Sequence, residues 1–167
     1  ETDSDTFVLT VTSVNDSPVL ADIEDQTTAE ETSLSITLSA IDPDGDNLSY
    51  SASSDTVDVT AEVTGSLLTL TPVENFNGTA TITVTVTDDG VPVETDSDTF
   101  VLTVTSSNDA PVLADIEDQT TAEETSLSIT LSATDSDGDN LSYSASSDTV
   151  DVTAEVTGTL LTLTPAD

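Results

Sequence analysis

The sequence predicts an all-β protein: an antiparallel, seven-stranded Greek-key β-sandwich that occurs in tandem. Three observations lead to this fold class. Apolar residues alternate with Thr and Ser over short runs, turn signals such as Asp-Gly and Asn-Gly separate the runs, and the first 74 residues recur 93 positions later. Alternation with period two indicates strands that have one buried and one solvated face, and seven such runs in one period fit a sandwich.

The seven expected strands follow one another with short connections. A short edge strand near Val19–Leu20 comes first, and the apolar positions of the other six fall within residues 34–40, 48–52, 57–63, 68–70, 80–86 and 100–104. The stretch TTAEETS (27–33) starts like a helix, but the alternation that follows it is that of a strand. We therefore expect no helix longer than one turn.

The repeat also sets the domain boundaries. Aligning each residue with the one 93 positions later matches 67 of 74 positions. The linker stretches NDSPVL (15–20) and NDAPVL (108–113) each lie between two strand runs, so a complete domain is expected at 15–107. Residues 1–14 then correspond to the last strand of a preceding repeat, and residues 108–167 to the first five strands of a following one. We expect the remaining strands to continue in the native chain rather than to come from a neighbouring chain.

Composition excludes several classes of function. The chain has 34 Asp and Glu but no Lys, Arg, His or Cys, which gives a formal net charge of −34. Ordinary nucleophile–base pairs and cationic phosphate clamps cannot be built, and five Tyr and Phe are few for a glycosidase cleft, so no enzyme is expected. Such a surface repels nucleic acid and attracts cations. No apolar run approaches the ~20 residues that span a bilayer, so membrane insertion is not expected either.

The stretch AIDPDGDNLSY (40–50) places Asp42, Asp44 and Asp46 at alternate positions around a glycine, and it recurs as ATDSDGDNLSY (133–143). Three interpretations are open: a self-contained EF-hand loop, one part of a composite metal site, or a polar turn. The EF-hand pattern fails at its sixth position, which is Asn47, and at its twelfth, which is Ser53.

A composite site follows from sandwich topology. Connections alternate between the two ends of a sandwich, so Asp16, Asp42, Asp44 and Asp88 are expected at one end. Glu30 or Glu31 is expected at the opposite end, where it would face the next linker. Calcium takes six to eight oxygen ligands in irregular geometry, whereas magnesium demands octahedral order, so calcium fits such a site better.

The turn that contains Asp88, Gly90 and Pro92, the following strand and the Asn15-Asp16 linker together resemble the end of a cadherin repeat. The whole period resembles the cadherin-like or Ig-like tandem extender repeats of large bacterial surface adhesins. This resemblance implies calcium ions at the inter-domain junctions, which stiffen an extracellular chain. Ser13 and Ser106 stand where the family has a further acid, which implies fewer ions per junction. The implied metal ligands are Asn15, Asp16, Glu30, Asp42, Asp44 and Asp88, then Asn108, Asp109, Glu123, Asp135 and Asp137, with Asp46 and Asp139 as the third acids of the two loops.

We therefore expect a structural extender repeat on a bacterial cell surface, with calcium and the neighbouring repeats as partners. The alternative is an adhesive module that binds carbohydrate or a like chain in a filament or cell–cell contact. Against a carbohydrate site, Tyr50 and Phe100 fall on inward positions of their expected strands.

Overall fold

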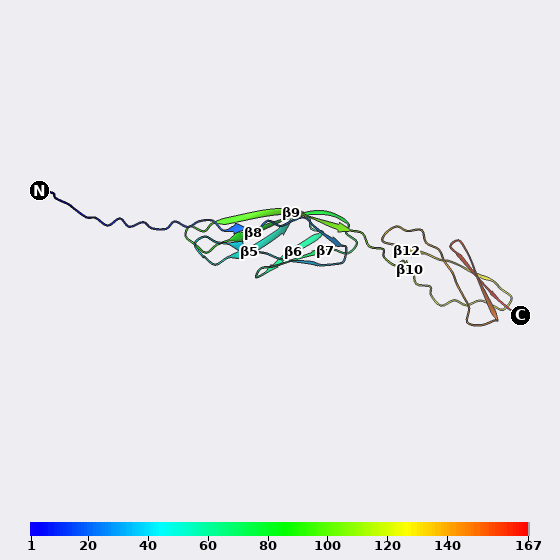
Figure 1. Cartoon of the computed structure of the whole chain (residues 1–167). Helices are drawn as coiled ribbons and strands as arrows, with labels where there is room; N and C mark the ends of the chain where they lie inside the picture. Colours follow the sequence, from blue (N-terminus) through cyan, green and yellow to red (C-terminus); the bar gives the residue numbers. More distant parts are fainter. Residues whose placement is uncertain (167) are drawn as a thin grey trace. The chain divides into compact units, whose positions relative to one another are not determined.

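The computed structural model describes residues 1–166 (Figure 1). The chain forms two compact units, unit 1 at residues 1–107 and unit 2 from residue 108 onward. Over residues 1–166 every regular element is a β-strand, which confirms the all-β class. In this described part of the chain, no helix is long and apolar enough to cross a membrane.

Nine strands are found in residues 1–107, all of which are described. They are β1 (Val19–Leu20), β2 (Gln26–Ala29), β3 (Leu34–Thr37), β4 (Ala40–Ile41), β5 (Ser49–Ser54), β6 (Val59–Thr64), β7 (Leu67–Pro72), β8 (Gly78–Thr87) and β9 (Thr95–Thr105). One sheet has the order β2-β9-β8-β5 and a second has the order β3-β7-β6, while β1 pairs with β4. All pairs are antiparallel except β2 and β9, which run parallel.

The strand count therefore differs from the seven expected. The run at 34–40 is divided, because after β3 the Leu38 amide bonds Ser66 O while Ser39 O accepts from Ala21 N. Strand β2 was not expected, because its sequence QTTA lacks an apolar alternation. Its pairing with β9 also makes the sheet mixed rather than wholly antiparallel.

The expected strand at 57–63 begins two residues late. The side chain of Val57 is 92% exposed, so its expected inward position is wrong. The cause is a local turn in which the Thr56 hydroxyl donates to the Asp58 carboxylate and accepts from the Asp58 amide. Such side-chain bonds to the nearby backbone compete with a strand ladder.

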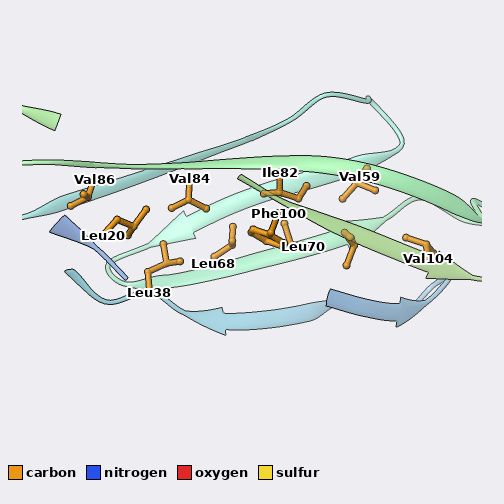
Figure 2. Packing of buried hydrophobic residues seen from close by; sticks show 12 residues of the cluster. Leu20, Leu38, Val59, Leu68, Leu70, Ile82, Val84, Val86, Phe100 and Val104 are labelled. Carbon is orange, nitrogen blue, oxygen red and sulfur yellow. The ribbon is translucent and has the colours of Figure 1, made fainter. Parts of the chain in front are cut away.

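The core of unit 1 lies between its two sheets (Figure 2). Strands β7, β8 and β9 contribute the most deeply buried side chains, which are Leu68, Leu70, Ile82, Val84, Val86 and Leu102. The alternating residues of these strands are Thr or Ser for the most part, as one solvated face requires. Both ends of the sandwich are thus left to the connecting loops.

Unit 2 keeps only part of this architecture. Its strands are β10 (Val112–Leu113), β11 (Leu127–Thr130), β12 (Ala133–Thr134), β13 (Val152–Thr157) and β14 (Leu160–Pro165). They form a sheet of order β11-β14-β13 and a β10–β12 pair. These elements correspond to the β3-β7-β6 sheet and the β1–β4 pair of unit 1.

Candidate metal centre

The loop between β4 and β5 is organised around one carboxylate oxygen. Asp42 Oδ1 accepts hydrogen bonds from the amides of Asp44 (2.9 Å), Gly45 (2.9 Å) and Asp46 (3.2 Å). Gly45 has a φ of 83°, a left-handed conformation that glycine adopts without strain. The loop leads into strand β5 rather than into a helix, which excludes the EF-hand interpretation.

The second oxygen of the same carboxylate has no partner. Asp42 Oδ2 is buried and, among residues 1–166, it is the one buried side-chain oxygen or nitrogen without a hydrogen bond. A buried charged oxygen without a partner is costly. This atom therefore marks a place where a cation would be favourable.

The linker that precedes β1 is fastened to this end of the sandwich. Asn15 Nδ2 donates to Asp88 Oδ2 (2.8 Å) and to Pro92 O (2.9 Å), and the Asp16 amide donates to Asp44 Oδ2 (2.7 Å). The Asn15 side chain occupies the space that a Cβ on Gly90 would need, so any larger residue at position 90 would displace Asn15. The fold thus brings together residues that are 28 to 77 positions apart.

The connection after β8 supplies two further carboxylates, Asp88 and Asp89. Asp88 is 4% exposed, and the amides of Glu94 and Gly90 together with the Asn15 side chain hold its pKa below the usual value. The backbone and side chain of Asn47 donate to Asp89 and likewise lower its pKa. Sequence reasoning did not select Asp89 as a site residue; its neighbour Asp88 was the only signal.

Asp46 is the acid at this end whose pKa is raised. Burial raises the pKa of its half-buried carboxyl, and the charges of Asp42, Asp89, Asp88 and Asp44 raise it further. No Lys, Arg or His exists in the chain to offset this repulsion. Burial and the surrounding carboxylates together thus disfavour the charged form of Asp46.

Glu30 lies elsewhere, directly after β2. It is 4% exposed, its amide donates to Thr105 O (2.9 Å), and its carboxylate accepts from the Ser107 amide. Strand β2 runs parallel to β9, so Glu30 belongs to the end of unit 1 where β9 finishes. It does not join the residues around Asp42.

Unit 2 repeats the loop and the linker contact. Asp135 Oδ1 accepts from the amides of Asp137 (3.1 Å) and Asp139 (3.0 Å), and the Asp109 amide donates to Asp137 Oδ2 (2.6 Å). The side-chain amide of Asn108 donates to Asp109 O instead of to an acid of another loop. Glu123, the counterpart of Glu30, is exposed.

The acidic end of unit 1 presents mostly oxygen atoms that could act as metal ligands. We define this end by Asn15, Asp16, Asp42, Asp44, Asp46, Asp88 and Asp89. A hollow of about 350 Å³ opens there between Ser13, Asn15, Asp44, Asp46, Gly90 and Val91. Over residues 1–166, however, no three acidic side chains converge into a ready metal cluster. Several carboxylates point to backbone amides instead. The donor chemistry and the unpaired Asp42 Oδ2 fit calcium, although some carboxylates would have to turn toward the ion.

The two units are tandem all-β repeats with acidic connecting loops. The model of the bacterial Ig domain family (Big_9) matches residues 15–105 and again 108–167, and the chain belongs to this family. The match confirms the predicted resemblance to bacterial Ig-like repeats. A comparison with curated protein sequences finds no significant match.

Solved structures with a similar fold include cadherin ectodomains. Human CDH23 EC21-23 is 23% identical, with 75% of this chain and 48% of that chain covered and a TM-score of 0.48. The protocadherin GammaB4 ectodomain is 20% identical, with 90% of this chain and 29% of that chain covered and a TM-score of 0.46. A nucleoside hydrolase-related protein from Saccharophagus degradans is 23% identical, with 54% of this chain and 26% of that chain covered and a TM-score of 0.47. The chain thus spans about a quarter to a half of these structures.

Proposed function

We propose that this chain is part of an extender on a bacterial cell surface, in which calcium stiffens the linker that precedes each repeat. It has no enzymatic role in this proposal. In unit 1 the ion would be held by oxygens of Asp42, Asp44, Asp46 and Asp88, with Asn15 and Asp16 from the linker. In unit 2 the corresponding ligands are Asn108, Asp109, Asp135, Asp137 and Asp139.

The unpaired Asp42 Oδ2 carries this proposal. The three amides around Oδ1 already satisfy the needs of the turn, so the second oxygen serves no purpose in holding the loop. The crowded charges that raise the pKa of Asp46 point the same way, because a bound cation would relieve them. A mere polar turn accounts for the first oxygen but not for these two observations.

The linker contacts explain why calcium would stiffen the chain. Asn15 and Asp16 are fixed to Asp88 and Asp44 by hydrogen bonds between well-separated parts of unit 1. An ion shared by linker and loop oxygens would add a stronger constraint at the same place. Near-identical repeats suit a spacer, which needs number rather than individuality. The buried Phe100, which is 2% exposed, argues against an aromatic platform for sugar at that position.

Calorimetric calcium titration of the 167-residue chain tests the proposal. Asp42→Asn keeps an oxygen for the three loop amides but replaces the unpaired oxygen by an amide nitrogen. We expect calcium to bind the wild type with a Kd on the order of 10⁻⁴ to 10⁻³ M, as in extracellular modules. Asp42→Asn should abolish binding to unit 1, and Asp135→Asn should abolish binding to unit 2.

Glu62→Gln is the matched control, because it removes one charge from an exposed position of β6. It should leave the titration unchanged. In parallel, calcium should slow amide exchange at residues 13–17, and small-angle scattering should change when chelator is added. Absence of binding in the wild type, or equal binding by Asp42→Asn, would contradict the proposal.

A further inference from the structure

The first and last segments of the repeat in unit 1 are joined along their whole length. Strand β2 runs parallel to β9, so residues 19–30 lead from the acidic end toward the end of unit 1 where β9 finishes. Four residue pairs, from Gln26↔Leu102 to Ala29↔Thr105, form the parallel β2–β9 ladder at the centre of this contact.

Carboxylates continue the ladder where the backbones no longer pair. Leu20 N donates to Asp96 Oδ2 (2.9 Å) and Ile23 N donates to Asp98 Oδ2 (2.7 Å). Asp96 and Asp98 are half-buried and lie on the same face of β9 as Phe100. The residues between them are exposed and lie on the other face. Hydrogen bonds of this kind, with an ionised acceptor, are roughly twice as strong as neutral ones.

Carboxylates of the leading segment accept from β9 and from the residues after it. Val101 N donates to Asp25 Oδ1 (2.8 Å), and Ser107 N donates to the Glu30 carboxylate. Beyond the ladder, Glu30 N also donates to the backbone oxygen of Thr105 (2.9 Å). In a chain without Lys, Arg or His, these acids have no cationic partner and accept from backbone amides here. The cross-links therefore extend from Leu20 to Ser107.

The direction of this contact decides how it responds to tension. A pull along a tandem chain acts on unit 1 where the chain enters near Asn15 and leaves near Ser107. Because the two segments are parallel, the pull slides them past each other and loads all the cross-links at once. An antiparallel pair such as β6 and β7, pulled from its open end, would instead lose its bonds one at a time.

We infer that residues 19–30 and β9 form a force-bearing clamp, in which Asp25, Asp96 and Asp98 lock the leading segment onto the last strand. This inference rests on the proposed extender role, which puts the chain under tension. It does not require calcium, since none of its bonds involves the unpaired Asp42 oxygen.

Single-molecule force spectroscopy on the 167-residue chain tests the clamp. Because the chain has no Cys, attachment points can be chosen freely. One variant is pulled through terminal cysteines. A second is pulled through Val57→Cys and Val73→Cys, which flank the open end of the β6–β7 hairpin and are exposed. Pulled from its ends, residues 15–107 should release roughly 300 Å of chain, which distinguishes them from the shorter unit 2, whereas the hairpin geometry should release only roughly 50 Å, the length of residues 57–73.

At equal force we expect unit 1 to unfold at least tenfold more slowly when pulled from its ends than when the hairpin is pulled. Asp98→Ala should raise the end-to-end unfolding rate about tenfold, because one charged hydrogen bond is lost. Asp98→Asn, which keeps an acceptor and guards against misfolding, should have a smaller effect. Glu62→Ala is the control and should have none.

Equal rates in the two pulling geometries would overturn the clamp. So would an Asp98→Ala effect that is the same in both, because Asp98 would then be a general stabiliser. All measurements are repeated in chelator. Slow end-to-end unfolding in chelator, combined with no calcium binding by calorimetry, would refute the calcium proposal and leave the clamp intact.

Discussion

The two units share most of their sequence and yet differ in structure. Strand β5 (Ser49–Ser54) is formed in unit 1, whereas the corresponding residues 142–147 form no strand in unit 2, although they have the same sequence, SYSASS. Strand β2 (Gln26–Ala29) has the same relation to residues 119–122. Residues 1–13 likewise form no strand, although the identical residues 94–106 contain β9.

The difference follows from pairing partners. Strands β2 and β5 pair with β9 and β8, and the sequence of unit 2 aligns with unit 1 only up to Glu74, before those strands begin. The sheet β11-β14-β13 needs no such partner and forms in both units. Half of the sandwich therefore depends on β8 and β9, which are distant in sequence, whereas the other half is built on a local hairpin, β6–β7 or β13–β14.

Adding the sequence of β8 and β9 after unit 2 should remove the structural difference between the units, and this is the largest effect that we expect. We expect a chain that continues after Asp167 with a second copy of residues 75–107 to form strands at 119–122 and 142–147. Completion of the core should stabilise unit 2 by on the order of 5 kcal/mol, the size of a small domain's whole stability. Hydrogen exchange at residues 142–147 measures this directly.

The control for that experiment is a continuation of equal length in which every apolar residue is replaced by Ser. It should leave residues 142–147 unprotected. If the native continuation gave no protection either, dependence on β8 and β9 would not explain the difference between the units.

A single core substitution should sharpen the comparison. Leu70 is fully buried at 0% exposure, whereas its counterpart Leu163 is half-buried. We expect Leu70→Ala to lower the free energy of unfolding of unit 1 by about 2–5 kcal/mol, because it removes transfer energy and leaves a cavity. Leu163→Ala should cost clearly less. Urea unfolding followed by segment-resolved hydrogen exchange separates the two, and equal losses would contradict the prediction.

These comparisons also show how far the sequence could predict the fold. Alternating apolar residues such as Ile82, Val84 and Val86 predict their strand, because packing against a core decides it. Strand β2 was not predicted, because its pairing with β9, 76 residues away, determines it rather than its own residue pattern. Val57 was misplaced because local Thr56–Asp58 hydrogen bonds override the alternation.

The sequence predicted the members of the acidic end except Asp89, but not their contacts. Spacing and topology placed Asp42, Asp44 and Asp88 together, and the metal-ligand role of these residues stays a prediction. Sequence could not indicate which of the two Asp42 oxygens is unpaired, or that Asn47 binds Asp89. Such features depend on side-chain orientation, which residue spacing does not determine.

A change at Gly90 should affect unit 1 alone. Gly90→Ala puts a methyl group where the Asn15 side chain lies, so Asn15 must leave and lose its bonds to Asp88 and Pro92. We expect a loss of about 1–3 kcal/mol in the stability of unit 1. Asn15→Ala should reproduce this loss and should not add to it in the double variant, because both remove the same bonds. Additive losses would argue against that shared cause.

The smallest effect concerns acid titration at the acidic end of unit 1, measured without calcium. The raised pKa of Asp46 means that its charge destabilises the folded unit near neutral pH, and this cost disappears as the pH falls through that raised pKa. We expect Asp46→Asn to raise the melting temperature by a few degrees at pH ~7, and its advantage over wild type to shrink as the pH falls toward about 4. In unit 2 the exposed Asp139 has no counterparts of Asp88 and Asp89 beside it, so Asp139→Asn should have a smaller effect.

The pKa values of Asp88 and Asp89 are lowered, so these two charges stabilise the folded unit. Their stabilisation is present above pH ~4 and is lost as the pH falls below it. Both variants should therefore keep a loss of stability below about pH 4 in unit 1. An Asp46→Asn advantage that stays constant from pH 7 to 4 would show that the buried and crowded charge of Asp46 is not its cause.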